Sequence, residues 1–238
     1  MTVTIDAAGR YHASFVVEVP GVPLLPVERE VGIDLGLTHF AVLSDGTKVD
    51  APRIARKAAA KLQRAQKEYA RRQKGSANRE KSRRKVARAH VRVGDTRRDW
   101  LHKLSTTIVQ ENQLVAVEDL AVSGLARTRL ARSVHDAGWS TFVAMLEYKA
   151  RRAGRAFVRV DRWFPSTRAC SVCGAIGEAK PLHVRTWTCG CGTMHDRDVN
   201  AARNILAAGR AVMPVETTSG LGLPGRLSAK QEPAGSAA

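Results

Sequence analysis

The sequence predicts an α/β fold in which helices flank a mixed sheet, with an inserted basic helical hairpin and a zinc ribbon. Three observations support this prediction. Segments with strand-like patterns alternate along the chain with segments of helical periodicity. One long stretch is rich in Ala, Lys, Arg and Gln, and all four cysteines lie close together near the C-terminal end.

The first fifty residues predict short strands. Residues 1–20 resemble a hairpin, with "TVTI" as the first strand, a turn at "DAAG" and "YHASFVVEV" as the second strand. "PGVPLLP" is typical of a linker, because proline lacks the N–H that a sheet requires. "VGIDLGL", "HFAVLS" and a short strand near Lys48 then predict a small antiparallel meander.

The pattern becomes helical after Pro52. "RIARKAAAKLQRAQKEYARRQ" places Ile54, Ala58 and Leu62 at helical spacing, "KGSAN" interrupts it, and the following stretch resumes it. We therefore expect a helical hairpin over residues 52–105, with a second arm that is long or kinked near Gly94.

Positive charge is concentrated on this hairpin. The chain has 39 Lys and Arg against 22 Asp and Glu, and 18 of these basic residues lie between Arg53 and Arg98 beside only three acids. Salt bridges along a helix cannot neutralise such an excess, so a nucleic acid is the favoured partner. Few aromatic residues accompany the charge, which favours contact with the backbone over base stacking. The residues expected to contact nucleic acid are Arg56, Lys57, Lys61, Arg64, Arg71, Arg72, Lys74, Arg79, Lys81, Arg83, Arg84, Lys85 and Arg88.

The rest of the chain predicts two strands and two helices. The strands are expected at residues 114–122 and 155–160, and a helix at 138–154 ends at a glycine cap. "NAARNILAAG" predicts a further helix, and the Gly-, Pro- and Ser-rich residues 213–238 predict a loose tail.

Composition excludes two classes of protein. The sequence has no run of 18 apolar residues, and "MTVTIDAAGRYH" lacks the regions of a signal peptide, so we expect no membrane partner. A clustered set of cysteines differs from the spread of a disulfide-rich secreted domain. These observations predict a cytoplasmic, nucleoid-associated protein, and they do not address its oligomeric state.

The cysteines predict a structural zinc site. Cys170 and Cys173 form a CxxC knuckle, and Cys189 and Cys191 form a second, shorter CxC knuckle. Two knuckles at this separation are typical of a zinc ribbon with tetrahedral four-cysteine coordination. Because CxC narrows the turn around the metal, His183 or His195 is an alternative fourth ligand.

Three carboxylates stand out by context. Asp34 interrupts a predicted strand, Glu118 closes the apolar run "LVAVE", and Asp198 lies at the start of a predicted helix. Each has a structural explanation: Asp34 on a solvent face, Glu118 at a strand end, and Asp198 as a helix N-cap. Together they favour a cluster that binds two Mg²⁺ or Mn²⁺ ions, which at roughly 4 Å separation can hydrolyse a phosphodiester.

Several segments resemble one known family. "GIDLGLTHFAVLSDG", "VAVEDLAVSGL", "CSVCG" and "CGTMHDRDVNAARNIL" resemble the TnpB (OrfB) family of transposon-encoded proteins, which is related to the type V CRISPR effectors. The resemblance covers essentially the whole chain. It implies a RuvC-like nuclease of the RNase H fold, a zinc ribbon before the last catalytic segment, and cleavage of DNA guided by a transposon-derived RNA.

The resemblance also implies roles for individual residues. Asp34 matches the first RuvC aspartate and Glu118 the glutamate of the second motif. The last aspartate of the family precedes the asparagine of "NAARNI" by two positions, which selects Asp198 over Asp196; Asp196 is the alternative.

The resemblance divides the chain into five parts. Residues 1–20 resemble the final hairpin of an N-terminal β-barrel wedge domain, and members of the family generally carry more of that domain ahead of the nuclease. The nuclease core is expected at 21–165, the zinc ribbon at 166–194, the last catalytic segment at 195–212 and a flexible tail at 213–238.

The sequence is compatible with two functions. The first is an RNA-guided DNA endonuclease with a two-metal mechanism, favoured by the three carboxylates. The second is a catalytically silent nucleic-acid-binding regulator or remnant on the same scaffold, favoured by the short N-terminal part. A transposase that joins strands directly is disfavoured, because RuvC-type motifs cleave without strand transfer.

Overall fold

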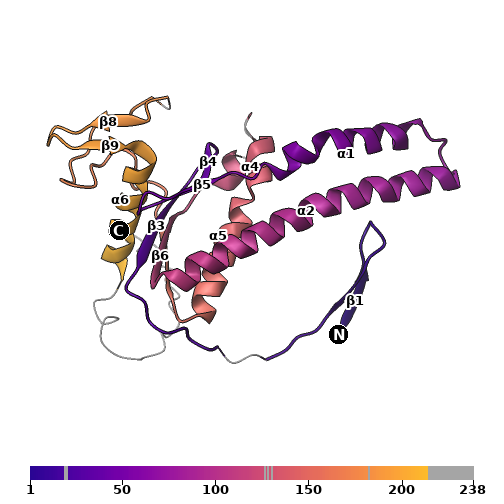
Figure 1. Ribbon diagram of the computed structural model, residues 1–238, viewed down its shortest axis with the longest axis horizontal. Helices are drawn as coiled ribbons and strands as arrows, with labels where there is room; N and C mark the ends of the chain where they lie inside the picture. The colour runs from indigo at the N-terminus through magenta and orange to yellow at the C-terminus, as the bar shows by residue number, and fades with distance from the viewer. Residues whose placement is uncertain (19–20, 126, 128, 130, 182, 214–238) are drawn as a thin grey trace, which may run out of the picture.

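A computed structural model describes most of the chain (Figure 1). The described residues are 1–18, 21–125, 127, 129, 131–181 and 183–213. All of the predicted loose tail after Met213 lies outside them.

A five-stranded mixed sheet forms the centre of the protein. Its strands are β3 (Glu30–Leu35), β4 (His39–Leu43), β5 (Lys48–Asp50), β6 (Leu114–Glu118) and β7 (Ala156–Val160). The order across the sheet is β5-β4-β3-β6-β7. Neighbours from β5 to β3 are antiparallel, which confirms the predicted meander, whereas β3, β6 and β7 are parallel to one another.

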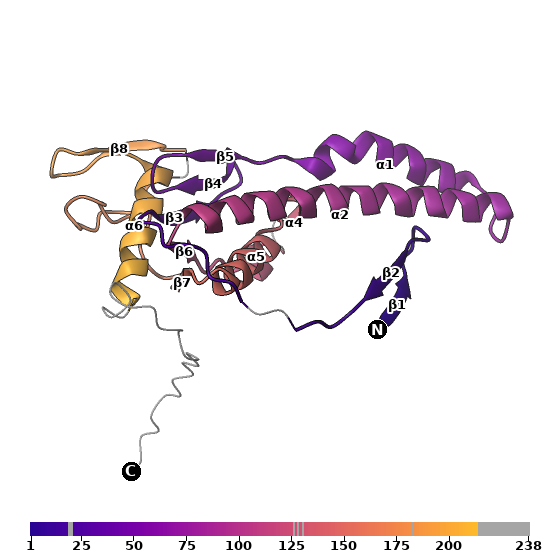
Figure 2. The ribbon, with the colours of Figure 1, turned by 60° about the horizontal axis from the view of Figure 1, so that its bottom comes forward.

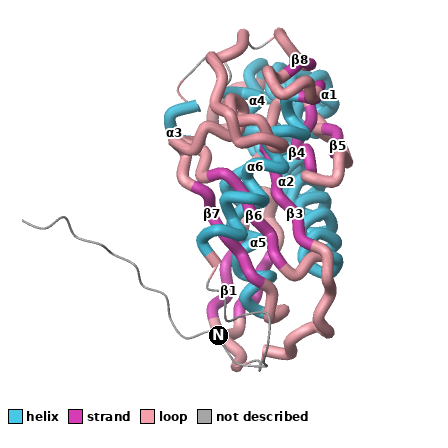
Figure 3. The backbone as a smooth tube through the Cα atoms, turned by 90° about the vertical axis from the view of Figure 1, so that its left-hand side faces the viewer, coloured by secondary structure: helices cyan, strands magenta, loops and turns pink. Residues whose placement is uncertain are grey.

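Different helices cover the two faces of the sheet. Alternate residues of a strand point to opposite faces, so each strand contributes to two separate cores. Val31, Ile33 and Leu35 of β3 face a core shared with α2 (Ala77–Glu111) and α5 (Trp139–Arg152). Ala116 of β6 faces the other core, which contains residues of α6 (Arg197–Val212). Figure 3 shows α6 over the parallel strands. Asp34 lies between Ile33 and Leu35 in β3, so its side chain points to the opposite face, the α6 side.

Helix α6 approaches the sheet closely at two glycines. A Cβ atom at Gly32 would lie 2.1 Å from the carbonyl oxygen of Ala202, and one at Gly209 would lie 2.6 Å from the Cβ of Ala116. Both separations are far below van der Waals contact. The missing side chains therefore let α6 lie directly against β3 and β6.

Helices α1 (Ile54–Arg71) and α2 form a long arm that extends away from the sheet (Figure 2). Helix α2 continues through Gly94, so the predicted second arm is long. None of the residues of α1 is buried, and the buried apolar residues of α2 lie at its C-terminal end beneath the sheet. The outer part of the arm therefore contributes little to the core.

The base of the arm is held by a contact from α4 (Ala131–Ala137). Arg53 precedes α1 in a left-handed conformation and gives it no side-chain cap. Asp136 of α4 replaces the cap, since its Oδ1 accepts hydrogen bonds from the backbone N–H of Ala55 at 3.0 Å and from Arg97 of α2 at 2.9 Å. One carboxylate thus joins three helices.

The N-terminal hairpin is shorter than predicted and lies apart from the central sheet (Figures 1 and 2). It consists of β1 (Thr2–Ile5) and β2 (Tyr11–Ser14), and every residue of both strands is exposed. Strand β2 ends at Ser14 because β1 has only four residues to pair with it. Arg10 in the turn forms an ion pair with Asp95 of α2 at 2.6 Å.

The end of strand β6 differs from the prediction, whereas the end of helix α5 agrees with it. Strand β6 ends at Glu118, not at residue 122, because the N–H of Leu120 donates to the carbonyl of Glu118 at 3.0 Å in a turn that leads to the short helix α3 (Val122–Leu125). Helix α5 is followed by Gly154 at φ 68°, which confirms the predicted glycine cap. Among the described helices, none has the length and apolarity that a membrane crossing needs.

Candidate functional site

Asp34 and Glu118 lie side by side at the C-terminal ends of two parallel strands. Ile33 of β3 is in register with Val117 of β6, so the next residues of the two strands, Asp34 and Glu118, are also neighbours. Side chains at matching positions of parallel strands share a face and lie about 5 Å apart. Gly32 and Ala116, two residues before Asp34 and Glu118, lie against α6. Because residues two apart in a strand share a face, both carboxylates lie on the α6 side.

The third predicted carboxylate lies in the first turn of α6. Asp196, and not Asp198, is the N-cap of this helix, because Asp196 Oδ1 accepts from the N–H of Asp198 at 3.1 Å and of Val199 at 3.0 Å. Its other oxygen accepts from Lys48 at 2.6 Å. The structural explanation of Asp198 as an N-cap is therefore wrong, and its carboxylate has no capping bonds to satisfy.

The negative charges of Glu118 and Asp198 both act on Asp34. Burial, followed by repulsion from Glu118 and Asp198, raises the pKa of Asp34 to about 8. Burial, followed by the charge of Asp119, also raises the pKa of Glu118. Buried like charges of this kind are unfavourable unless a cation compensates them. A cation beside Asp34 would relieve this repulsion.

Two basic residues near the cluster were not predicted. Arg185, which precedes strand β8 (Thr186–Thr188), lies 3.4 Å from Asp198 and 3.3 Å from the hydroxyl of Thr38. Lys48 of β5 holds the capping residue Asp196. Nothing in the local sequence around Arg185 or Lys48 distinguishes it from other basic residues, because each acts on a residue far away in the chain.

The raised pKa of Asp34 predicts a dependence of stability on pH. A carboxyl whose pKa is higher in the folded than in the unfolded chain stabilises the fold below the unfolded value, and this contribution is lost as the pH rises through the folded value. Without divalent metal, stability should therefore fall between pH 4 and pH 8. We expect Asp34→Asn to unfold at a higher temperature than the parent at pH 8, by at least about 1 kcal/mol or roughly 2–4 °C.

Thermal denaturation in EDTA, followed by circular dichroism, measures this difference. Asp50→Asn is the control, because the side chain of Asp50 is 90% exposed. If Asp34→Asn were no more stable than the parent at pH 8, the carboxylates would not repel one another as described.

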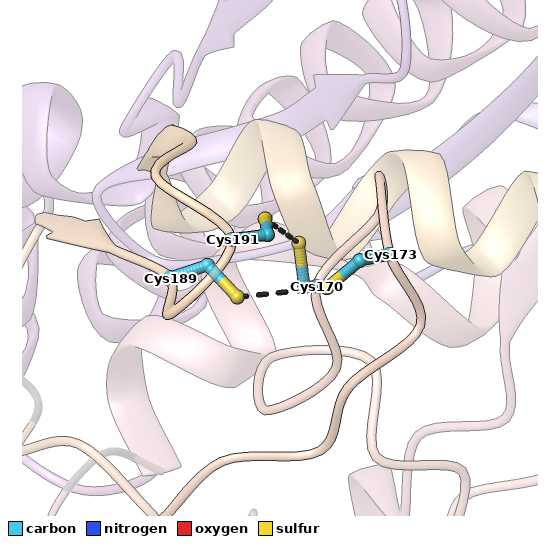
Figure 4. Close-up of side chains that lie close together, drawn as sticks. All are labelled: Cys170, Cys173, Cys189 and Cys191. Atoms are coloured by element: carbon cyan, nitrogen blue, oxygen red, sulfur yellow. Dashed lines mark hydrogen bonds between the residues drawn. The ribbon is translucent and has the colours of Figure 1, made fainter.

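The four cysteines form the second cluster (Figure 4). Their sulfur atoms all lie within 4.8 Å of one another, with Cys170 Sγ 3.8 Å from Cys191 Sγ and Cys173 Sγ 3.6 Å from Cys189 Sγ. Hydrogen bonding to Thr193 lowers the pKa of Cys191 to about 6, which favours the thiolate that binds metal. The arrangement is compatible with a zinc site.

The shorter CxC knuckle reaches the cluster without help from histidine. Cys191 lies among the other three sulfurs, while His183 is exposed and outside the group. His195 is 4% exposed and its Nε2 lies 3.1 Å from Cys170 Sγ, so it adjoins the group formed by the four cysteines. His195 belongs to β9 (Met194–Asp196), which pairs with β8 and leads directly to Asp196 and α6.

Most of the basic residues predicted to contact nucleic acid are exposed on the arm. Arg79 is the exception: it lies 4.3 Å above the ring of Tyr69 and donates to the carbonyls of Tyr69 and Arg72, so it closes the turn between α1 and α2. Arg72 and Lys85 pair with Glu68, and Arg83 and Arg84 pair with Glu80. Apart from Arg79, the predicted basic residues without an ion pair in the described part of the chain are Arg56, Lys57, Lys61, Arg64, Arg71, Lys74, Lys81 and Arg88.

Comparisons in sequence connect this architecture to known proteins. Residues 14–129 match the OrfB_IS605 family model, described as "Probable transposase", and residues 139–205 match the model "Cas12f1-like, TNB domain". A Streptomyces pristinaespiralis protein named "Putative RNA-guided DNA endonuclease" is 48% identical over 98% of this chain and 59% of its own length. The similarly named InsQ of Escherichia coli K12 is 33% identical over 96% of this chain and 60% of its own length.

A comparison of structures agrees on the fold. The protein in a cryo-EM structure of a Cas12f1-sgRNA-target DNA complex superposes with a TM-score of 0.54 at 16% identity, over 74% of this chain and 37% of that one. The mixed sheet and its helices thus have a Cas12f1-like arrangement. In each of these comparisons the chain spans less than two thirds of the other protein's length.

Proposed function

Because the chain belongs to the TnpB (OrfB) family, we propose that it is the nuclease portion of a transposon-encoded, RNA-guided DNA endonuclease. The observation that carries this proposal is the pairing of Asp34 with Glu118 at the ends of parallel strands, with Asp198 in the first turn of α6, near enough for its charge to act on Asp34. The core would be RuvC-like over residues 21–165, with the arm inserted, and the last catalytic segment would be 195–212. The zinc ribbon would occupy 166–194.

The donor set of the carboxylate cluster fits Mg²⁺ or Mn²⁺. Three carboxylates supply hard oxygen ligands, and the raised pKa of Asp34 reports negative charge that the neighbouring arginines do not neutralise. When bound, two such ions supply an activated water and stabilise the leaving oxygen of the phosphodiester, giving 3′-hydroxyl and 5′-phosphate ends. Asp34, Glu118 and Asp198 would hold the ions.

The chain's own residues position these ligands. Strands β3 and β6 fix the separation of Asp34 and Glu118 through their register. Asp196 fixes the start of α6 and so the place of Asp198, while Lys48 neutralises Asp196. Arg185 lies 3.4 Å from Asp198 and would supply a positive charge for a DNA phosphate at the site.

The cysteine cluster supports a structural Zn²⁺ ion in the ribbon. The ribbon has only two three-residue strands and an isolated bridge, so the metal would replace a core there. We expect the purified protein to contain about one zinc per chain and to lose it with Cys173→Ser, since Cys173 is exposed and its substitution leaves the central sheet unchanged. Elemental analysis measures the metal; Ser171→Ala is the control.

Loss of zinc should also affect the carboxylate site, because β9 leads from the ribbon into α6. Full zinc content in Cys173→Ser would contradict the assignment of this cysteine as a ligand.

The arm would bind the phosphates of DNA and of the guide RNA. For duplex DNA, the plot of log K against log salt becomes shallower by about 0.9 for each phosphate that the protein no longer neutralises. We expect the double substitution Lys61→Gln with Arg64→Gln to reduce the steepness of that plot by about 1.8. Arg151→Gln with Arg152→Gln on α5 removes the same charge away from the arm and should change the slope less.

Fluorescence anisotropy over a series of salt concentrations provides the two slopes. Equal effects of the two double substitutions would mean that the arm has no special part in binding.

A cleavage assay with a programmed guide tests the proposed function. The protein is produced together with RNA from the adjoining transposon end, and plasmids with and without the matching target are incubated with it and Mg²⁺. We expect cleavage only of the matching plasmid. A second function, binding without cleavage, would need only the exposed basic residues of the arm and the cysteine cluster. Tight binding with no cleavage under any condition would favour that second function.

A further inference from the structure

Trp163 is the most exposed large aromatic side chain of the described residues. Its side chain is 85% exposed, whereas Trp139 is 3% exposed and Trp100 and Trp187 are half-buried. Single exposed apolar residues are common on protein surfaces. Exposure alone therefore does not indicate a function for Trp163, and its position in the fold is needed as well.

Trp163 follows the end of the strand next to the carboxylate cluster. Strand β7 ends at Val160, which is in register with Glu118 of β6, and the N–H of Asp119 donates to the carbonyl of Val160 at 2.9 Å. Three residues further on, Trp163 lies at the edge of the sheet where the parallel strands end. Ligands of open α/β sheets bind outside these carboxyl ends.

The turn that carries Trp163 is fixed on both sides. The N–H of Trp163 donates to Asp161 Oδ1 at 2.7 Å, and Arg162 donates to Asp119 Oδ2 at 2.5 Å. Phe164, the next residue, packs into the core beneath α6. The indole is therefore presented to solvent by an ordered segment, and a ligand that covers it would lose little conformational freedom on binding.

We propose that Trp163 is a stacking platform for an unpaired base of the single-stranded nucleic acid that enters the carboxylate cluster. This inference rests on the proposed function, because it names a contact of the strand held at that site. An aromatic face stacks on any of the bases, and such contacts are a common way of binding single strands. Arg162 beside it pairs with Asp119, so stacking and not charge would carry the contact.

A thermodynamic cycle isolates this contact. Affinities are measured in EDTA, in an Asp34→Ala background, for a short single-stranded DNA and for an oligonucleotide of equal length made of abasic spacers. Trp163→Ala is expected to weaken binding of the DNA by about 5- to 150-fold and to leave binding of the abasic strand unchanged. Trp163→Phe should retain most of the affinity, and Tyr148→Ala, at an exposed aromatic residue on α5, should have no such effect.

The salt dependence of affinity distinguishes base stacking on Trp163 from phosphate binding by the arm. The decrease in affinity caused by Trp163→Ala should be nearly independent of salt, whereas binding by the arm falls as salt rises. Equal decreases for the two strands, or no decrease for the DNA, would overturn the proposal, provided that thermal denaturation shows an unchanged fold. The cycle needs no cleavage, so it distinguishes failure of the stacking contact from failure of the nuclease function.

Discussion

Asp198→Ala is expected to lower the rate of metal-dependent DNA cleavage by at least about 1,000-fold, with little change in stability. A decrease of this size is typical when one of several catalytic residues that act together is removed. Asp198 makes no capping bonds, and its one basic neighbour, Arg185, lies 3.4 Å away. Its substitution therefore removes a ligand of the proposed ions without disturbing the helix. Single-turnover cleavage of labelled DNA measures the rate.

Asp196→Ala is the matched control, two residues earlier in the same turn. It removes the cap that accepts from two backbone N–H groups and from Lys48. We expect it to destabilise the protein by about 1 kcal/mol while a substantial part of the cleavage rate remains. The opposite result, a silent Asp198→Ala and an inactive Asp196→Ala, would assign the metal ligand to Asp196.

Gly32→Ala is expected to destabilise the whole protein and to inactivate the site together. The new Cβ would lie 2.1 Å from Ala202 O and 2.6 Å from Leu206 N, both backbone atoms that cannot rotate away. Helix α6 would have to move off β3, carrying Asp198 away from Asp34. We expect a loss of at least about 3 kcal/mol, or roughly 6–12 °C in Tm.

Gly94→Ala provides the control for this substitution. A Cβ atom there meets no atom within 4 Å, and Gly94 lies inside α2 with helical geometry. The alanine is expected to stabilise the protein by about 0.5–1 kcal/mol. Calorimetry of both variants measures the contrast, and a Gly32→Ala variant as stable as the parent would contradict the close packing of α6 on β3.

The strands and their carboxylates could be predicted because their signal is local. "VGIDLGL" and "LVAVE" each place one acid in an apolar run, and this pattern does not depend on the rest of the chain. The register that brings Asp34 beside Glu118 is a property of the sheet, in which these two strands are adjacent although more than 80 residues separate them.

The details that could not be predicted depend on distant partners. Asp196 and Asp198 are equally suitable as N-caps by residue type, and only the start of α6 decides between them. Arg185 reaches Asp198 only because β8 and β9 pair and fold the ribbon back on the start of α6.

We propose that Asp34, Glu118 and Asp198 form a metal-dependent nuclease site. The most direct test is cleavage of labelled single-stranded DNA by the purified protein with Mg²⁺ or Mn²⁺, beside Asp34→Ala and Glu118→Ala. Asp50→Ala, at an exposed carboxylate of β5, is the control. Cleavage that needs the metal, that both site substitutions abolish and that Asp50→Ala retains is the result we predict. Cleavage that persists in Asp34→Ala, or its absence from the intact protein even with guide RNA, would contradict the claim.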